Sequence, residues 1–153
     1  MKSNGTTRQL LKFGININTT SQNVWDIMLQ PETYKEWVSV SWPESSYDGR
    51  WVEGEEIRFS TPGSGGTLAK VEKLQEGKFI SIRHIAVVNH DETLDQESDF
   101  AKRWIGTTEE YTFKKLDNQT NLEVVITTTS EWKSMFMDGW PNALAKLKEV
   151  CER

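Results

Sequence analysis

The order of strand-like and helix-like patterns is the feature that most constrains this chain. A strand is predicted around Phe13 to Ile17, because apolar and polar residues alternate there with a period of two. Two short helices follow, then an unbroken series of strands as far as Thr129, and one long amphipathic helix closes the chain. This order predicts an α+β fold in which a curved antiparallel sheet holds a helix, with room for a ligand between them.

Caps and prolines mark the two short helices. Thr20 offers a side-chain oxygen that can accept a free backbone N–H at the start of the first helix, whose apolar stripe includes Val24 and Met28. Pro31 should end that helix, because the residue before a proline avoids the helical conformation. The same proline can open the second helix, which we expect to run to Trp37.

The last helix is predicted from its apolar stripe. Pro141 should kink this helix or mark a restart, with Asp138 as the new cap. The apolar residues recur at the spacing of a single helix face and are Phe136, Trp140, Leu144, Leu147 and Cys151.

Short connections separate the predicted strands. Ile57 and Phe59 alternate with charged neighbours in one strand, and a glycine-rich hairpin connection over residues 61–66 follows. Strands linked this tightly should be antiparallel neighbours. Gly14 and Gly106 suit a bend or a bulge in such a sheet. The remaining strands are predicted over residues 68–74, 79–88, 104–116 and 122–129.

Length and composition indicate a globular protein. The chain has 153 residues, of which 36% are hydrophobic, so we expect one domain over residues 1–153 with a loose tail at residues 1–9. The longest aliphatic stretch, residues 85–88, is too short to cross a bilayer, and the N-terminus shows no apolar signal segment. Because Cys151 is the only cysteine, an internal disulfide is excluded and a cytoplasmic location is expected.

Charge and motifs argue against several functions. The net charge is −5 and the 18 basic residues are scattered, which argues against a nucleic-acid-binding face. The acidic stretch over residues 89–103 lacks the glycine and closing glutamate of a calcium-binding hand, so we predict a solvated loop, with room for a helical turn, that acts as a lid. The glycines at 63–66 are followed by neither the helix nor the lysine of a phosphate cradle. No metal and no cofactor is therefore expected.

Several phrases of the sequence together resemble one superfamily. They are Val24-Trp25 with Pro31-Glu32 and Trp37, residues 104–113, residues 121–124, and Gly139-Trp140 with Leu144 and Leu147. Their order resembles the START-like superfamily, also called SRPBCC, the helix-grip fold or the birch-pollen-allergen fold. Within it the chain is most similar to the branch named after activators of a heat-shock chaperone ATPase, and it also resembles polyketide cyclase-like proteins. The similarity spans residues 11–151.

The resemblance implies a fold with an internal cavity for a ligand. It implies a curved seven-stranded antiparallel sheet wrapped around the long C-terminal helix, with two short helices after the first strand. Members of the superfamily typically hold apolar molecules, such as lipids, sterols or polyketides, between sheet and helix. Some members are enzymes that steer cyclisation or dehydration, and others carry or sense the ligand.

His84 is one of two candidates for acid–base chemistry. It and His90 are the only histidines, and it lies in the predicted strand over residues 79–88. If the face that carries Ile82 is the inner one, His84 points into the cavity as a proton donor or ligand anchor. If the face that carries Arg83 is the inner one, it does not. Periodicity leaves both arrangements open, and a hydrogen-bonded histidine without a functional role is the alternative.

Glu109 is the other candidate. It shares a strand face with Tyr111 and Phe113, and burial among aromatic rings would raise the pKa of its carboxyl. The alternative is a residue at the rim, paired with a lysine or arginine.

Three functional hypotheses follow. The first is a protein that binds a small apolar or aromatic ligand in the cavity. The second is an enzyme of the cyclase or dehydratase kind, with His84 and Glu109 as acid and base. The third is a protein-interaction module with a protein partner or a second copy of the chain. The expected ligand-binding residues are Trp37, Phe59, Ile82, His84, Trp104, Tyr111, Phe113, Met137 and Trp140.

Overall fold

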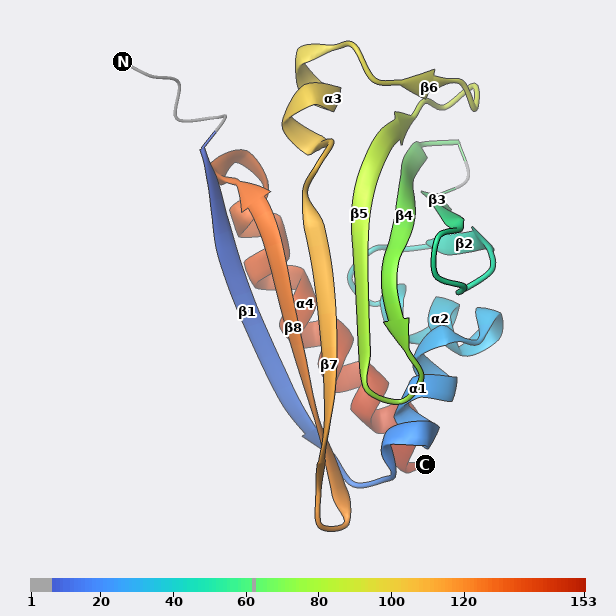
Figure 1. The fold of residues 1–153 in the computed structure, drawn as a ribbon, viewed down its shortest axis with the longest axis vertical. Helices are drawn as coiled ribbons and strands as arrows, with labels where there is room; N and C mark the ends of the chain where they lie inside the picture. The colour runs from blue at the N-terminus through green and yellow to red at the C-terminus, as the bar shows by residue number, and fades with distance from the viewer. Residues whose placement is uncertain (1–6, 62) are drawn as a thin grey trace.

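One curved antiparallel sheet and a long C-terminal helix make up most of the molecule (Figure 1). The computed structural model describes residues 7–61 and 63–153 of the chain. In chain order the elements are β1 (Arg8–Ile17), α1 (Ser21–Leu29), α2 (Pro31–Val38), β2 (Ser46–Gly49), β3 (Glu56–Thr61), β4 (Gly65–Gln75), β5 (Phe79–Val88), β6 (Leu94–Asp95), α3 (Asp99–Trp104), β7 (Thr108–Leu116), β8 (Gln119–Thr129) and α4 (Ser130–Glu152).

The sheet has the predicted antiparallel pairing. Its strand order is β1-β8-β7-β5-β4-β3-β2, which gives the seven strands that were expected. The two-residue strand β6 pairs with the end of β5 and makes an eighth. The neighbours β3-β4, β4-β5 and β7-β8 are joined by short connections, in agreement with the hairpin prediction.

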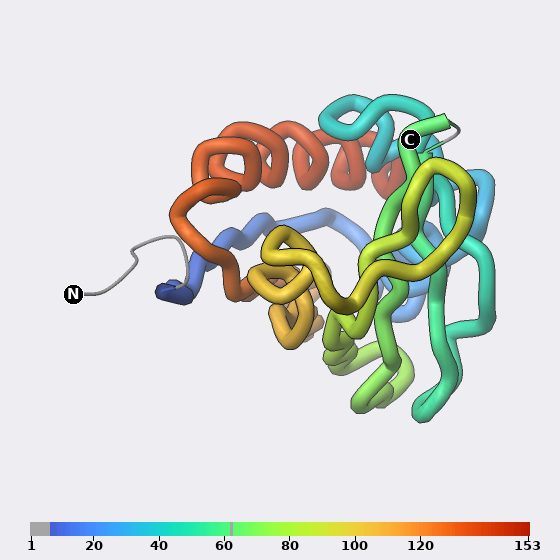
Figure 2. The backbone as a smooth tube through the Cα atoms, turned by 90° about the horizontal axis from the view of Figure 1, so that it is seen from above, coloured from blue at the N-terminus to red at the C-terminus, as the bar shows by residue number. Residues whose placement is uncertain are grey.

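The two short helices form for the reasons that the sequence indicates. The Thr20 side chain accepts a hydrogen bond from the backbone N–H of Asn23, which caps α1. Pro31 is the first residue of α2, where its missing N–H leaves no hydrogen bond unmade. Figure 2 shows α4, in red, lying along one face of the curved sheet, so the sheet and the helices form two layers.

The last helix buries the predicted apolar stripe but does not restart at Pro141. The helix α4 continues from Ser130 to Glu152 with the proline inside it. Proline removes the hydrogen bond that the carbonyl of Met137 would accept four residues earlier. Met137 lies on the exposed side of α4, where water can replace that bond. Trp140 and Leu144 stay packed against the core and hold both halves of the helix in place.

Two predicted boundaries are wrong. Arg8 and Gln9 are not part of a tail but pair with Thr129 and Thr128 as the start of β1. Thr7 has no regular secondary structure, and residues 1–6 of the predicted tail lie outside the described residues. Trp104 does not begin a strand but ends α3, which Ser98 caps through the backbone N–H of Ala101. The chain then turns at Gly106, whose φ of +92° favours glycine, before β7 begins.

The core differs between the two ends of the sheet. Ile17, Val24, Leu122 and Leu147 are completely buried where α1 and the second half of α4 cover the sheet. We call this the closed end; it lies at the bottom of Figure 1. At the opposite end, beside the first half of α4, large aromatic rings replace the aliphatic side chains.

None of the helices in residues 7–61 and 63–153 is long and apolar enough to cross a membrane.

Candidate ligand-binding site

A cavity of about 260 Å³ lies between the sheet and the first half of α4. Its walls come from α1, α2, α3, β3, β4, β5, β7 and α4, together with the segments that precede and follow β2. The volume is just below the range of about 300–1,000 Å³ that is usual for ligand pockets, so a guest must be small. The aromatic residues of the wall are Tyr34, Trp37, Trp42, Trp51, Phe59, Trp104, Tyr111, Phe136 and Trp140.

The structure places six of the nine expected ligand-binding residues on this wall: Trp37, Phe59, His84, Trp104, Tyr111 and Trp140. The other three lie elsewhere. Ile82 is buried on the inner face of β5 below the cavity, and Phe113, further along β7, packs against Trp25 of α1 with ring centroids 5.3 Å apart. Met137 is exposed, because it is one helical step from Phe136 and that step of about 100° turns it away from the sheet.

Backbone contacts fix the aromatic wall. The indole Nε1 of Trp37 donates a hydrogen bond to the carbonyl of Met28 at 3.1 Å, which ties α2 to α1. Trp42 lies against Gly139 of α4, where an added Cβ would come within 2.7 Å of the indole ring. The Ser41 hydroxyl donates to the carbonyl of the same glycine at 2.6 Å. The glycine therefore lets the segment after α2 pack directly on the helix and close one side of the cavity.

Glycine also shapes the opposite wall. A Cβ on Gly66 of β4 would lie 1.8 Å from the carbonyl oxygen of Phe59 on the neighbouring strand. The predicted glycine-rich connection thus has a steric role, since it lets β3 and β4 approach closely beside the cavity. Pro62 of that connection lies outside the described residues.

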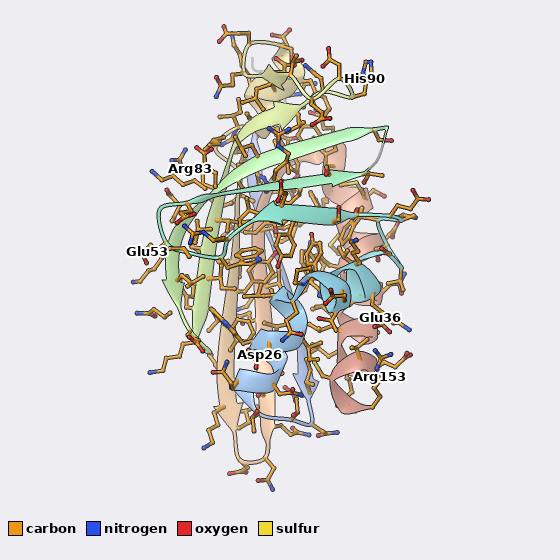
Figure 3. All side chains as sticks on the ribbon, turned by 90° about the vertical axis from the view of Figure 1, so that its right-hand side faces the viewer. Asp26, Glu36, Glu53, Arg83, His90 and Arg153 are labelled. Atoms are coloured by element: carbon orange, nitrogen blue, oxygen red, sulfur yellow. The ribbon has the colours of Figure 1, made fainter. Side chains whose placement is uncertain are left out.

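The alternation of β5 resolves the question that periodicity left open. Ile80, Ile82 and His84 are buried on the inner face, whereas Arg83 lies on the outer face and pairs with Glu72 at 3.1 Å. Figure 3 shows Arg83 pointing away from the molecule, and it shows His90 at the far end, on the exposed turn after β5. Only His84 of the two histidines lines the cavity.

Four polar side chains form a chain of hydrogen bonds across three neighbouring strands. Thr67 Oγ1 of β4 lies 3.0 Å from His84 Nδ1 of β5. The Nε2 atom of the same imidazole lies 3.0 Å from Glu109 Oε2 of β7. The Tyr111 hydroxyl donates to the second carboxylate oxygen of Glu109. The structure therefore brings together the two residues that were predicted for acid–base chemistry, and adds two that were not.

The outer end of this chain is an indole. Trp104 Nε1 donates to Thr67 Oγ1 at 2.7 Å, and the Thr67 hydroxyl also lies 3.2 Å from the carbonyl oxygen of Ala86. Backbone bonds hold His84 in place, because its N–H donates to Thr107 at 2.9 Å and its carbonyl accepts from Gly106 at 2.8 Å. The cluster is thus part of the sheet and does not depend on a mobile loop.

The expected pKa shift of Glu109 is wrong in direction. Burial raises the pKa of its carboxyl, but the hydrogen bond and charge of His84 and the hydrogen bond from Tyr111 outweigh that effect. The pKa of Glu109 is therefore lowered and the group is ionised at neutral pH. The alternative of a rim residue paired with lysine or arginine is also wrong, because its partners are His84 and Tyr111.

The same charge acts on two tyrosines of the wall. Burial and the nearby carboxylate of Glu109 raise the pKa of Tyr111 well above its usual value. Burial is also the main cause of the raised pKa of Tyr34, to which Glu109 contributes. Both phenols therefore stay protonated, and Tyr111 remains a hydrogen-bond donor to Glu109.

Several wall residues escaped the sequence-based prediction. Tyr34 lies in α2 and Trp42 in the segment that follows α2. Their spacing in the sequence does not show that they face the sheet across the cavity. Thr67 carries no signal of its own, because it joins the cluster only through the pairing of β4 with β5. Among the described residues, no group of three or more His, Cys, Asp or Glu side chains is placed to hold a metal ion.

The fold is shared with several solved structures. The crystal structure of protein MLL2253 from Mesorhizobium loti is 15% identical, with a TM-score of 0.75 over 95% of this chain and 98% of that one. The solution structure of the Aha1 dimer from Colwellia psychrerythraea is 22% identical, with a TM-score of 0.67 over 94% of this chain and 96% of that one. CalU16 from Micromonospora echinospora is 16% identical, with a TM-score of 0.64 over 94% of this chain and 76% of that one.

No curated protein sequence matches the chain significantly. Residues 18–152, however, match the family described as Activator of Hsp90 ATPase homolog 1-like protein. This match includes both short helices, every strand after β1 and all of α4, so it covers the cavity as well as its frame. The chain therefore belongs to the Activator of Hsp90 ATPase homolog 1-like family, the branch of the START-like superfamily that the sequence resembles.

Proposed function

We propose that this protein binds a small hydrophobic or aromatic molecule in the cavity between the sheet and α4. The observation that carries the proposal is the cavity itself: about 260 Å³ of space bordered by nine aromatic side chains. Aromatic rings of this size normally fill a core, so a wall built from them that leaves a void has room for a guest.

The driving force would be burial of the apolar surface of the guest. Each Å² of apolar surface removed from water contributes about 25 cal/mol. Most of the wall is built on strands and helices, with Trp42 and Trp51 on connecting segments, so little ordering of the backbone is needed on binding. Family membership supports a ligand-binding or cyclase-like module. The chemical nature of the guest has to be inferred from the residues of the cavity wall.

Freshly purified protein tests the proposal. Native mass spectrometry should show a non-covalent adduct, and tryptophan emission should change on titration with a panel of small aromatic and aliphatic compounds. Phe59→Ala should weaken binding about tenfold or more, because it removes a ring from the wall. Leu10→Ala is the control, since Leu10 is exposed and is not part of the cavity wall. A protein that carries no adduct and whose emission ignores every compound would contradict the proposal.

The bonded pair of His84 and Glu109 favours a second function, acid–base catalysis on the bound molecule. The two side chains lie 3.0 Å apart on the cavity wall, so a proton can pass between them, and general acid–base catalysis uses groups of these types. Both imidazole nitrogens already face protein oxygens, so a proton would reach the guest through Glu109 or Thr67. In this case His84→Gln should abolish turnover of a bound substrate while binding is retained. Unchanged turnover would exclude the role.

A further inference from the structure

Of the described residues on the cavity wall, Glu109 alone has a negative side-chain charge. Its side chain is 19% exposed, and the described part of the wall contains no lysine and no arginine. Among the described residues its one ion-pair partner is His84. An ionised carboxylate therefore stands on a mostly aromatic wall, which also carries the imidazole of His84 and the uncharged hydroxyls of Ser45, Ser60, Thr61 and Thr67.

The hydrogen-bond count leaves part of this carboxylate free. An ionised carboxylate has about four acceptor positions, and His84 and Tyr111 use one on each oxygen. The remaining positions have no donor among the described side chains. A guest that carries an N–H or a positive charge can approach them.

The proton on the Thr67 hydroxyl decides the net charge of the cluster. A hydroxyl has one proton, and Trp104 already uses a lone pair of this oxygen. If the proton goes to His84 Nδ1, the imidazole is neutral, its Nε2–H donates to Glu109, and the cavity keeps one negative charge. If the proton goes to the carbonyl of Ala86, both ring nitrogens carry protons and the cluster is neutral. Neither arrangement favours an anion beside Glu109.

The aromatic wall also favours a positively charged guest. The faces of indole and phenol rings carry negative potential and attract organic cations, most strongly for tryptophan. Five tryptophans and two tyrosines surround the space that Glu109 reaches: Trp37, Trp42, Trp51, Trp104, Trp140, Tyr34 and Tyr111.

We propose that the guest of this cavity is an organic cation: a small apolar or aromatic body that carries a protonated amine or a quaternary ammonium group, placed against Glu109 and the surrounding rings. This inference rests on the proposed ligand-binding function and names the class of its ligand. The charge of His84 helps to lower the pKa of Glu109 in the free protein, and the cation of the guest would take the place of that charge. In the complex His84 is therefore neutral, and the carboxylate charge is available to the guest.

Three probes of nearly one shape test the sign of the charge. Benzyltrimethylammonium is cationic, neopentylbenzene is its neutral isostere, and phenylmethanesulfonate carries a negative charge at the same place. Binding is followed by tryptophan emission and by calorimetry. The cation should bind about tenfold or more tightly than the neutral isostere, and the anion should bind most weakly.

Three variants locate the effect. Glu109→Gln should abolish the preference for the cation while the neutral isostere binds as before. Glu110→Gln removes the same charge from the neighbouring position, which is not part of the cavity wall, and should leave the preference intact. His84→Gln should retain the preference, because it removes a possible positive charge from beside the carboxylate. Thermal unfolding of each variant checks that it is folded.

The outcomes separate this inference from the function on which it rests. If the neutral isostere binds as tightly as the cation, or if Glu109→Gln leaves the preference unchanged, the cation inference is overturned and ligand binding stands. If the preference appears only in His84→Gln, the wild-type cluster is neutral and the inference is also overturned. If none of the three probes nor any member of the wider panel binds, the proposed function itself fails.

Discussion

The two ends of the sheet are built from different side chains, and the difference explains where a guest can enter. At the closed end, branched aliphatic residues such as Ile17, Val24 and Leu147 pack with no exposure. At the cavity end, rings stand edge to face and tilted against one another, as Trp42 and Trp140 do at 69°. The aliphatic side chains fill the closed end, whereas the rings at the other end, which come from helices, strands and connections, leave the cavity between them.

The comparison predicts where a truncation is most damaging. Leu147→Ala at the closed end should lower the free energy of unfolding by about 2–5 kcal/mol, because it opens a new cavity in a filled core. Urea unfolding followed by circular dichroism measures the loss. A loss below about 1 kcal/mol would mean that the closed end is not packed as described.

Truncation at the cavity end should have a smaller effect on stability. Phe59 is half-buried and borders space that is already empty, so Phe59→Ala should lower the free energy of unfolding by less than about 2 kcal/mol. The same urea titration gives the value. If Phe59→Ala were as damaging as Leu147→Ala, the two ends would be equally filled and the contrast between them would be lost.

The smallest expected effect is the dependence of stability on acid. The pKa of Glu109 is lowered in the folded protein, so its contribution to stability is complete above the ordinary glutamate pKa of about 4.3 and is lost as the pH falls through the folded value. Glu109→Gln should therefore lose less stability than the wild type between pH 5 and the folded pKa. Thermal midpoints across that range measure the difference, and parallel curves for the two proteins would contradict the lowered pKa.

The fold was predictable because its signals are local. The alternation from Phe79 to Val88 and the stripe from Phe136 to Cys151 each need only neighbours along the chain, and both are confirmed. Trp104 was misplaced because the residues after it have a strand-like composition, while the helix before it depends on a single cap at Ser98. The local pattern of apolar and polar residues does not show at which residue a helix ends before the next strand begins.

The site was only partly predictable because its chemistry depends on register. Glu109 meets His84 across a strand pairing in which Ile82, not His84, stands directly opposite. A one-residue slip would turn either side chain away from the cavity. The sign of the pKa shift of Glu109 follows from that contact, so composition alone, which suggested a carboxylate in apolar surroundings, predicted the wrong direction. Thr67 could not have been found without the same register.

A crystal of the ligand-free protein under xenon pressure tests the central claim most directly, since xenon enters enclosed apolar space in a protein and leaves packed regions empty. The account predicts xenon density beside Trp37, Phe59 and Trp140, and none among Ile17, Val24 and Leu147. Aromatic side chains in mutual contact, with no xenon between the sheet and the first half of α4, would contradict it.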